Sequence, residues 1–204
     1  MQSIGGTVWL YTVVGLEQLG LDLHRDKILT PVIGEYAILA QALEAGTIDA
    51  VFISIPAFSQ RLKQKGFPIL AELNLPVAGN VVVVTSAYLQ QHSDRVENVL
   101  KALMEGLAFV LTPKNKVTVL ETLMKRLQIS DPTLVEETYQ GLLKELDRKP
   151  YPSIEGMQNI QRMMQGSNPR LGDVKVADLI DSSFVRKLDE SGFIDRLYAT
   201  YGGK

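Results

Sequence analysis

Hydrophobic and polar positions follow two different patterns along the chain, and the change comes near residue 85. Before it, short apolar runs alternate with longer amphipathic segments, which is typical of strands that alternate with helices. After it, apolar residues recur at helical spacing. Thr133–Leu146, for example, has Leu134, Thr138, Leu142 and Leu146 at every fourth position. One face of that helix should therefore be buried.

The first part is expected to contain three helices, each stopped by a glycine. They are 7–19, 35–45 and 56–65, followed by Gly20, Gly46 and Gly66. The apolar runs between them predict strands at 26–33, 48–53 and 69–73, and the β-branched run NVVVVT predicts a further strand at 80–85. Such an alternation favours a parallel sheet with helices on its faces.

The second part is expected to be mostly helical. Predicted helices cover 93–111, 114–128, 131–147, 153–165 and 183–190, with Asp131-Pro132 and Ser153 as start signals. A single strand cannot cover the apolar faces of so many helices. They could pack on one another as a bundle, or they could be the outer layer of a sheet whose other strands are missing.

Composition excludes several classes of function. The 204 residues carry a formal net charge of −2 without a block of Lys or Arg, so nucleic-acid binding lacks its electrostatic basis. Apolar runs are shorter than a membrane span, and residues 1–20 do not read as a signal peptide. Without cysteine, thiolate catalysis and disulfides are excluded. No metal-ligand spacing and no nucleophile with its base is visible, so we expect no catalytic residue, no metal and no cofactor.

The opening stretch, MQSIGGTVW, combines Ser3, Gly5, Gly6 and Thr7 in a turn that should begin a helix. Free backbone N–H groups at a helix start suit an anionic group, and glycines let a ligand come close to the backbone. The alternative is an ordinary N-cap. A ligand turn of this kind normally follows a buried strand, and only Met1 and Gln2 precede it here.

Three stretches resemble the periplasmic solute-binding proteins that serve aliphatic sulfonates and thiamine-pyrimidine precursors. The stretches are GTIDAVFISIPAFSQRLKQKGFPIL (46–70), NVVVVTSAYLQQHSDRVENVLKAL (80–103) and SSFVRKLDESGFID (182–195). The resemblance implies an α/β, type II periplasmic-binding-protein-like bilobed fold, truncated at its N-terminus. Residues 1–76 would be lobe two without its first strand, 77–85 the crossover strand, and 86–204 the helical remainder of lobe one.

The same resemblance implies the solute-binding component of an ABC-type importer, at the periplasmic or extracellular face. Its partners would be a small anionic or heterocyclic solute and, transiently, a membrane permease, without nucleic acid or membrane insertion. Ligand-binding candidates lie in the opening turn and at the ends of predicted strands: Ser3, Ile4, Gly5, Gly6, Thr7, Trp9, Gly34, Glu35, Ser54, Ile55 and Pro56. Trp9 could equally be a packing residue, and Ser54–Pro56 a simple loop.

Two other classes of function remain open at this point. One is a cytosolic enzyme on the same bilobed fold, such as those of the futalosine pathway to menaquinone. The other is the ligand-sensing domain of a transcriptional regulator, although no DNA-binding helix pair is visible.

Overall fold

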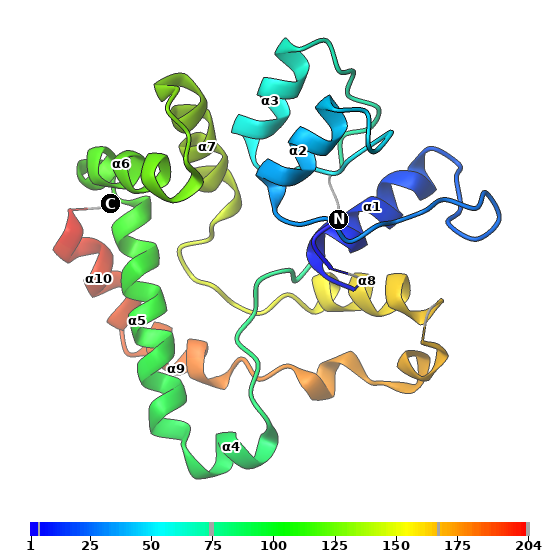
Figure 1. Cartoon of the computed structure of the whole chain (residues 1–204). Coiled ribbons are helices and arrows are strands. Elements are labelled where there is room, and N and C mark those ends of the chain that lie inside the picture. The colour runs from blue at the N-terminus through cyan, green and yellow to red at the C-terminus, as the bar shows by residue number, and fades with distance from the viewer. Residues whose placement is uncertain (4, 74–75, 167, 203–204) are drawn as a thin grey trace. The chain divides into compact units, whose positions relative to one another are not determined.

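The chain is all-α in its computed structural model, which describes residues 1–3, 5–73, 76–166 and 168–202. It is 62% helical, and none of the described residues belongs to a β-strand. The expected α/β, type II bilobed fold is therefore wrong. Figure 1 shows the helices, whose bounds are α1 Thr7–Gln18, α2 Tyr36–Glu44, α3 Pro56–Gln64, α4 Ser86–Gln91, α5 Ser93–Leu111, α6 Lys116–Leu127, α7 Pro132–Glu145, α8 Ile154–Gln165, α9 Ser183–Glu190 and α10 Phe193–Tyr201, with 3-10 turns at Pro113–Asn115, Pro169–Asp173 and Val176–Leu179.

The eight predicted helices are confirmed to within three residues at each end, and their start and stop signals explain why. Gly20, Gly46 and Gly66 end α1, α2 and α3 with φ of 74°, 68° and 88°, a region that glycine enters without strain. Asp131 Oδ1 accepts a hydrogen bond from Thr133 N–H and so caps α7. Helices α4 and α10 were not predicted.

The four predicted strands do not form, because no neighbouring strand in the described part of the chain accepts their backbone hydrogen bonds. Segments 26–33, 48–53, 69–73 and 80–85 form no strand in their described residues, although they contain the right residue types. β-propensity measures how well a side chain fits a half-buried pleated surface, and a strand needs a neighbour to accept its backbone hydrogen bonds. Leu29 is 89% exposed, which shows how little covers these runs.

The described chain divides into two compact units. The first contains Met1–Gly79 and Ser153–Ala177, and the second contains Asn80–Pro152 and Asp178–Lys204. In the first unit, α1 packs on α8 and α2 on α3 (Figure 1). Arg61 and Lys65 of α3 bind the carboxylate of Glu44 of α2 at 2.9 and 2.7 Å. Its core consists of Met1, Val8, Trp9, Leu10, Val14, Leu39 and Met163.

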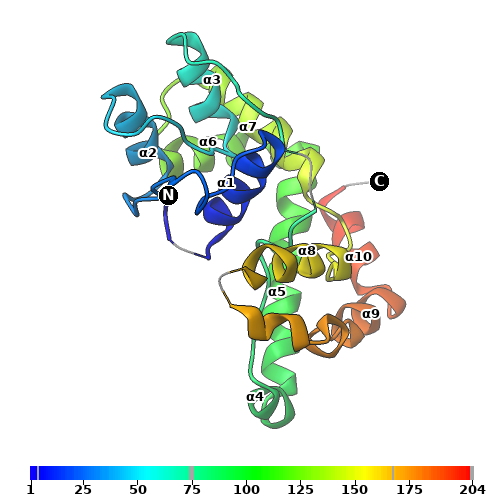
Figure 2. The same ribbon diagram turned by 90° about the vertical axis from the view of Figure 1, so that its right-hand side faces the viewer.

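The second unit is organised around α5, the longest helix described. Helices α9 and α10 lie beside it, as both views show (Figures 1 and 2). Lys187 of α9 binds Glu97 of α5 at 2.6 Å, and Lys116 of α6 binds Glu136 of α7 at 2.7 Å. The core around α5 consists of Met104, Ala108, Val185, Leu188, Ile194 and Tyr198. No helix in the described part of the chain combines the length and apolar character that crossing a membrane requires.

Candidate functional site

The turn before α1 ends at Gly6, which is the N-cap residue of the helix. Its backbone is extended, with φ −78° and ψ 170°, and its carbonyl accepts the first helical hydrogen bond from Leu10 N–H at 3.0 Å. No side chain caps this end of α1. The N–H of Gly6 donates to Ser3 O at 3.4 Å, and no described residue accepts from the N–H of Thr7 or Val8. Among the described residues these two donors have no acceptor, which is usual at a helix start.

The two glycines of this turn have different roles. Gly5 has a φ of 76°, so its conformation itself favours glycine. Gly6 has an ordinary φ, but a Cβ there would collide with the Ser3 hydroxyl. Thr7 donates from Oγ1 to Gly79 O at 3.4 Å. Ile4, also a predicted ligand residue, lies outside the described residues.

The reason for choosing Gly34, Glu35 and Ser54–Pro56, their place at the ends of parallel strands, is wrong because 26–33 and 48–53 form no strand. Side chains nevertheless join the turns before α1, α2 and α3 to one another. Gln2 Nε2 donates to Glu35 Oε2 at 2.6 Å and links the turn before α1 to the N-cap residue of α2. The hydroxyls of Tyr36 and Ser54 lie 2.7 Å apart and link the start of α2 to the turn before α3. Ile33 N–H also donates to Met1 O at 2.9 Å. The N-termini of α1, α2 and α3 are thereby connected in chain order.

The backbone supports this arrangement at the second and third turns. Gly34 has a φ of 149°, which few residues other than glycine adopt, and it turns the chain into Glu35. Ile55 is the N-cap residue of α3, and Pro56 takes the first helical position, where its missing N–H costs nothing. Ser3, Glu35 and Ser54 are exposed, so their polar groups are accessible.

Trp9 does not join the other candidates. It is 8% exposed and belongs to the core of the first unit, which favours the packing alternative. With Met163 and Leu23 it lines a separate hollow of about 130 Å³ at the opposite end of α1.

Sequence reasoning selected neither Gln2 nor Tyr36. The Tyr36 ring does stack near Phe58, with centroids 6.5 Å apart, but its hydroxyl reaches Ser54 as well. The only available signal was position, since Gln2 precedes the first turn and Tyr36 follows Glu35 directly. Their partners lie 33 and 18 residues away, and no local pattern predicts such pairs.

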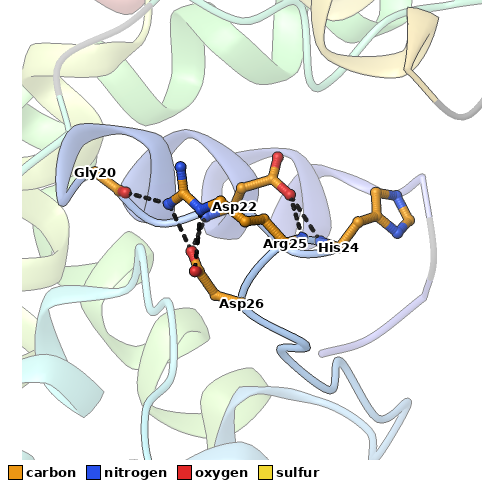
Figure 3. Close-up of polar contacts among 5 residues, drawn as sticks. All are labelled: Gly20, Asp22, His24, Arg25 and Asp26. Carbon is orange, nitrogen blue, oxygen red and sulfur yellow. Dashed lines mark hydrogen bonds and ion pairs between the residues drawn. The ribbon is translucent and has the colours of Figure 1, made fainter.

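A second polar group closes the end of α1 and is shown in Figure 3. Asp22 Oδ1 accepts from the backbone N–H groups of His24 and Arg25 at 2.9 and 2.7 Å. The Arg25 guanidinium binds both carboxylate oxygens of Asp26 at 3.0 and 2.7 Å and the Gly20 carbonyl at 2.6 Å. All of these contacts are local. The group therefore holds the 20–26 loop together.

Arg25 also sets the ionisation of this loop. Its side-chain hydrogen bond, followed by the Asp22 N–H, lowers the pKa of Asp26 to about 2. The pKa of Asp22 is lowered chiefly by the backbone hydrogen bonds from Arg25 and His24. Among the described residues, no three His, Asp or Glu side chains gather as a metal ion would require.

No protein-family description, curated protein or solved structure matches this chain.

Proposed function

We propose that this chain is the solute-binding component of an ABC-type importer, and that it binds a small heterocyclic solute at the joined turns before α1, α2 and α3. The observation that carries the proposal is the pair of contacts Gln2–Glu35 and Tyr36–Ser54, which connect the turns before α1, α2 and α3. The resemblance of 46–70, 80–103 and 182–195 to solute-binding proteins supports the transport role.

The chemistry of these turns favours an amino-bearing solute over a simple anion. Hydroxyl groups come from Ser3, Thr7, Tyr36 and Ser54, and a hydroxyl can donate or accept a hydrogen bond. The Thr7 hydroxyl already donates to Gly79 O and offers a solute only its acceptor. Segments 1–7, 33–36 and 54–58 contain no Lys or Arg, and their one charged side chain is that of Glu35. The Met1 ammonium is already bound, since it donates to Pro31 O at 2.8 Å. A carboxylate accepts hydrogen bonds from an amino group and repels an anion. Helix N-termini alone would favour an anion, and Glu35 opposes that preference.

In this proposal the solute is held by a few polar contacts and then delivered to a membrane permease. The amino group of a heterocycle would donate to Glu35, its ring nitrogens would accept from hydroxyl groups, and the N–H groups at the start of α1 would bind a further acceptor. Each such hydrogen bond contributes about 1 kcal/mol net. The permease contact and the periplasmic or extracellular location belong to the same proposal.

Calorimetry on the full chain tests the proposal with two probes. One is a 4-aminopyrimidine that carries a hydroxymethyl group, and the other is ethanesulfonate. We expect binding of the aminopyrimidine, with affinity reduced about tenfold or more in Glu35→Gln, which corresponds to about 1.4 kcal/mol. Glu121→Gln is the matched control, because Glu121 is an exposed carboxylate on α6 in the second unit.

Two results would contradict the proposal. If neither probe produces a heat of binding in calorimetry, the proposal that this chain binds a solute of this class is wrong. If ethanesulfonate binds and Glu35→Gln strengthens it, the turns form an anion site and the assignment to an amino-bearing heterocycle is wrong.

A further inference from the structure

The hollow beside Trp9 lies within the first unit, between α1, α8 and the 20–26 loop. Its volume is about 130 Å³. An apolar cavity of about 150 Å³ holds one benzene molecule, so this hollow has room for a single six-membered ring. Most of its walls are apolar side chains, which are Trp9, Val13, Leu16, Leu21, Leu23 and Met163.

Trp9 is the aromatic wall of this hollow. It is buried in the core of the first unit together with Val14 and Met163, so its ring is held in place before any ligand arrives. A side chain that is already fixed loses no conformational freedom on binding. Aromatic rings also pack on one another in stacked or edge-to-face arrangements that are more favourable than the buried area alone. The wall therefore favours an aromatic ligand.

The charge that lines the hollow is negative. Its acidic side chains are Glu17 and Asp22, and no Lys or Arg is among the described residues that line it. Arg162 of α8 binds Glu17 Oε2 at 3.3 Å, and this contact offsets the charge of Glu17. Asp22 is therefore the carboxylate that a cationic ligand would meet.

Asp22 has one carboxylate oxygen without a donor. Oδ1 accepts from the backbone N–H groups of Arg25 and His24, whereas no described residue donates to Oδ2 (Figure 3). The Arg25 guanidinium binds both oxygens of Asp26 instead, and the His24 ring, which also lines the hollow, is directed away from the Asp22 carboxylate. The backbone hydrogen bonds lower the pKa of Asp22, so this carboxylate is ionised at neutral pH.

From the size of the hollow, its fixed indole wall and the available oxygen of Asp22, we infer that it binds a small aromatic ammonium ion. The ring occupies the apolar space beside Trp9, and the ammonium donates a charge-assisted hydrogen bond to Asp22 Oδ2. A ring with a neutral substituent lacks that bond, and an aromatic carboxylate is repelled by Asp22. None of the residues that line the hollow belongs to the three joined turns, so this inference does not rest on the proposed function.

The fluorescence of Trp9 tests the inference, because Trp9 is the only tryptophan of the chain. Benzylamine, benzyl alcohol and benzoate share one ring and differ in charge, and each is added to the full chain at neutral pH. We expect benzylamine to change the Trp9 fluorescence until the site is saturated. Benzyl alcohol should bind about tenfold more weakly or worse, because it loses a charge-assisted hydrogen bond. Benzoate should not bind.

Asp22→Asn removes the charge and keeps the loop, because an amide oxygen can still accept the two backbone N–H groups. We expect this variant to lose about tenfold or more of the affinity for benzylamine, at an unchanged melting temperature. Asp49→Asn is the matched control, because Asp49 is an exposed carboxylate of the same unit that does not line the hollow. It should bind benzylamine as wild type does.

Three results would overturn the inference. One is a Trp9 fluorescence that benzylamine leaves unchanged or changes without saturation. Another is benzyl alcohol or benzoate binding as tightly as benzylamine. The third is a folded Asp22→Asn that binds benzylamine with wild-type affinity. If Asp22→Asn does not fold, the comparison of the three probes on wild type decides.

Discussion

The hydroxyl groups of Tyr36 and Ser54 lie 2.7 Å apart, and this contact joins the start of α2 to the turn before α3. Since the contact is exposed, its net contribution should be at most about 1 kcal/mol. We expect Tyr36→Phe and Ser54→Ala each to lower the free energy of unfolding by that amount, and the double variant to add little more. Urea unfolding of the four proteins measures the coupling. Fully additive losses would show that the two hydroxyls do not interact.

The two glycines of the first turn should respond differently to alanine. Gly5→Ala should cost about 1 kcal/mol of stability, because its φ of 76° strains any residue with a Cβ. At Gly6 the φ is −78°, and only the exposed Ser3 hydroxyl stands in the way. Gly6→Ala should therefore cost less, and Ser3→Ala should remove most of that cost. Melting temperatures of the three single variants and of the Ser3/Gly6 double variant test this order, which an equal loss at both glycines would contradict.

Substitutions at Leu39 and Leu29 distinguish the observed all-α fold from the expected α/β fold. Leu39 of α2 is fully buried, whereas Leu29 is 89% exposed. Leu39→Ala should lower the free energy of unfolding by about 2–5 kcal/mol, as large-to-small core substitutions do. Leu29→Ala should change it by less than about 0.5 kcal/mol. If 26–33 were instead a buried strand, Leu29→Ala would be as costly as Leu39→Ala, and the all-α account would fail.

The 20–26 loop should show a distinct acid titration. The pKa of Asp26 is lowered to about 2 by the Arg25 side chain and the Asp22 N–H. Because a lowered pKa favours the ionised form in the folded state, its stabilising effect is complete above the ordinary value near 3.8 and is lost as the pH falls toward 2. In Arg25→Gln, the pKa of Asp26 should rise toward its ordinary value.

The pKa of Asp26 is measured from the NMR chemical shifts of its carboxyl group, recorded from roughly pH 6 down to roughly pH 1.5. Glu97 is the internal control, because its pKa is also about 2 but is lowered by Lys101 and Lys187 in the second unit. It should not respond to Arg25→Gln. An Asp26 pKa that is already ordinary in wild type would contradict the contacts of Figure 3.

The sequence was sufficient to predict the helix ends but not to predict which distant segments of the chain contact each other. Gly20, Gly46 and Asp131 act within one helical turn, so the helix ends they mark could be predicted from neighbouring residues. Strand formation depends on a distant segment that accepts hydrogen bonds, and the apolar run at 80–85 has none. Residue type alone could not show this.

The candidate site also has a part that the sequence could predict and a part that it could not. The turns themselves were predictable, because glycine, serine and proline mark the starts of α1, α2 and α3. The contacts that join these turns link Gln2 to Glu35 and Tyr36 to Ser54 across long stretches of chain. Those contacts follow from packing of the first unit, which no local pattern encodes. The sequence left both a ligand role and a packing role open for Trp9, and the side chain lies in the core of the first unit.

The most direct test of the account is a map of where a solute binds. Backbone amide shifts should be recorded by NMR while the hydroxymethyl 4-aminopyrimidine is added to the full chain. We predict that the largest changes fall on Gly5–Thr7, Glu35–Tyr36 and Ser54–Ile55 together, with little change at Leu21–His24 in the hollow beside Trp9. Changes confined to that hollow, or spread over the second unit, would contradict the claim that the three joined turns form the binding site.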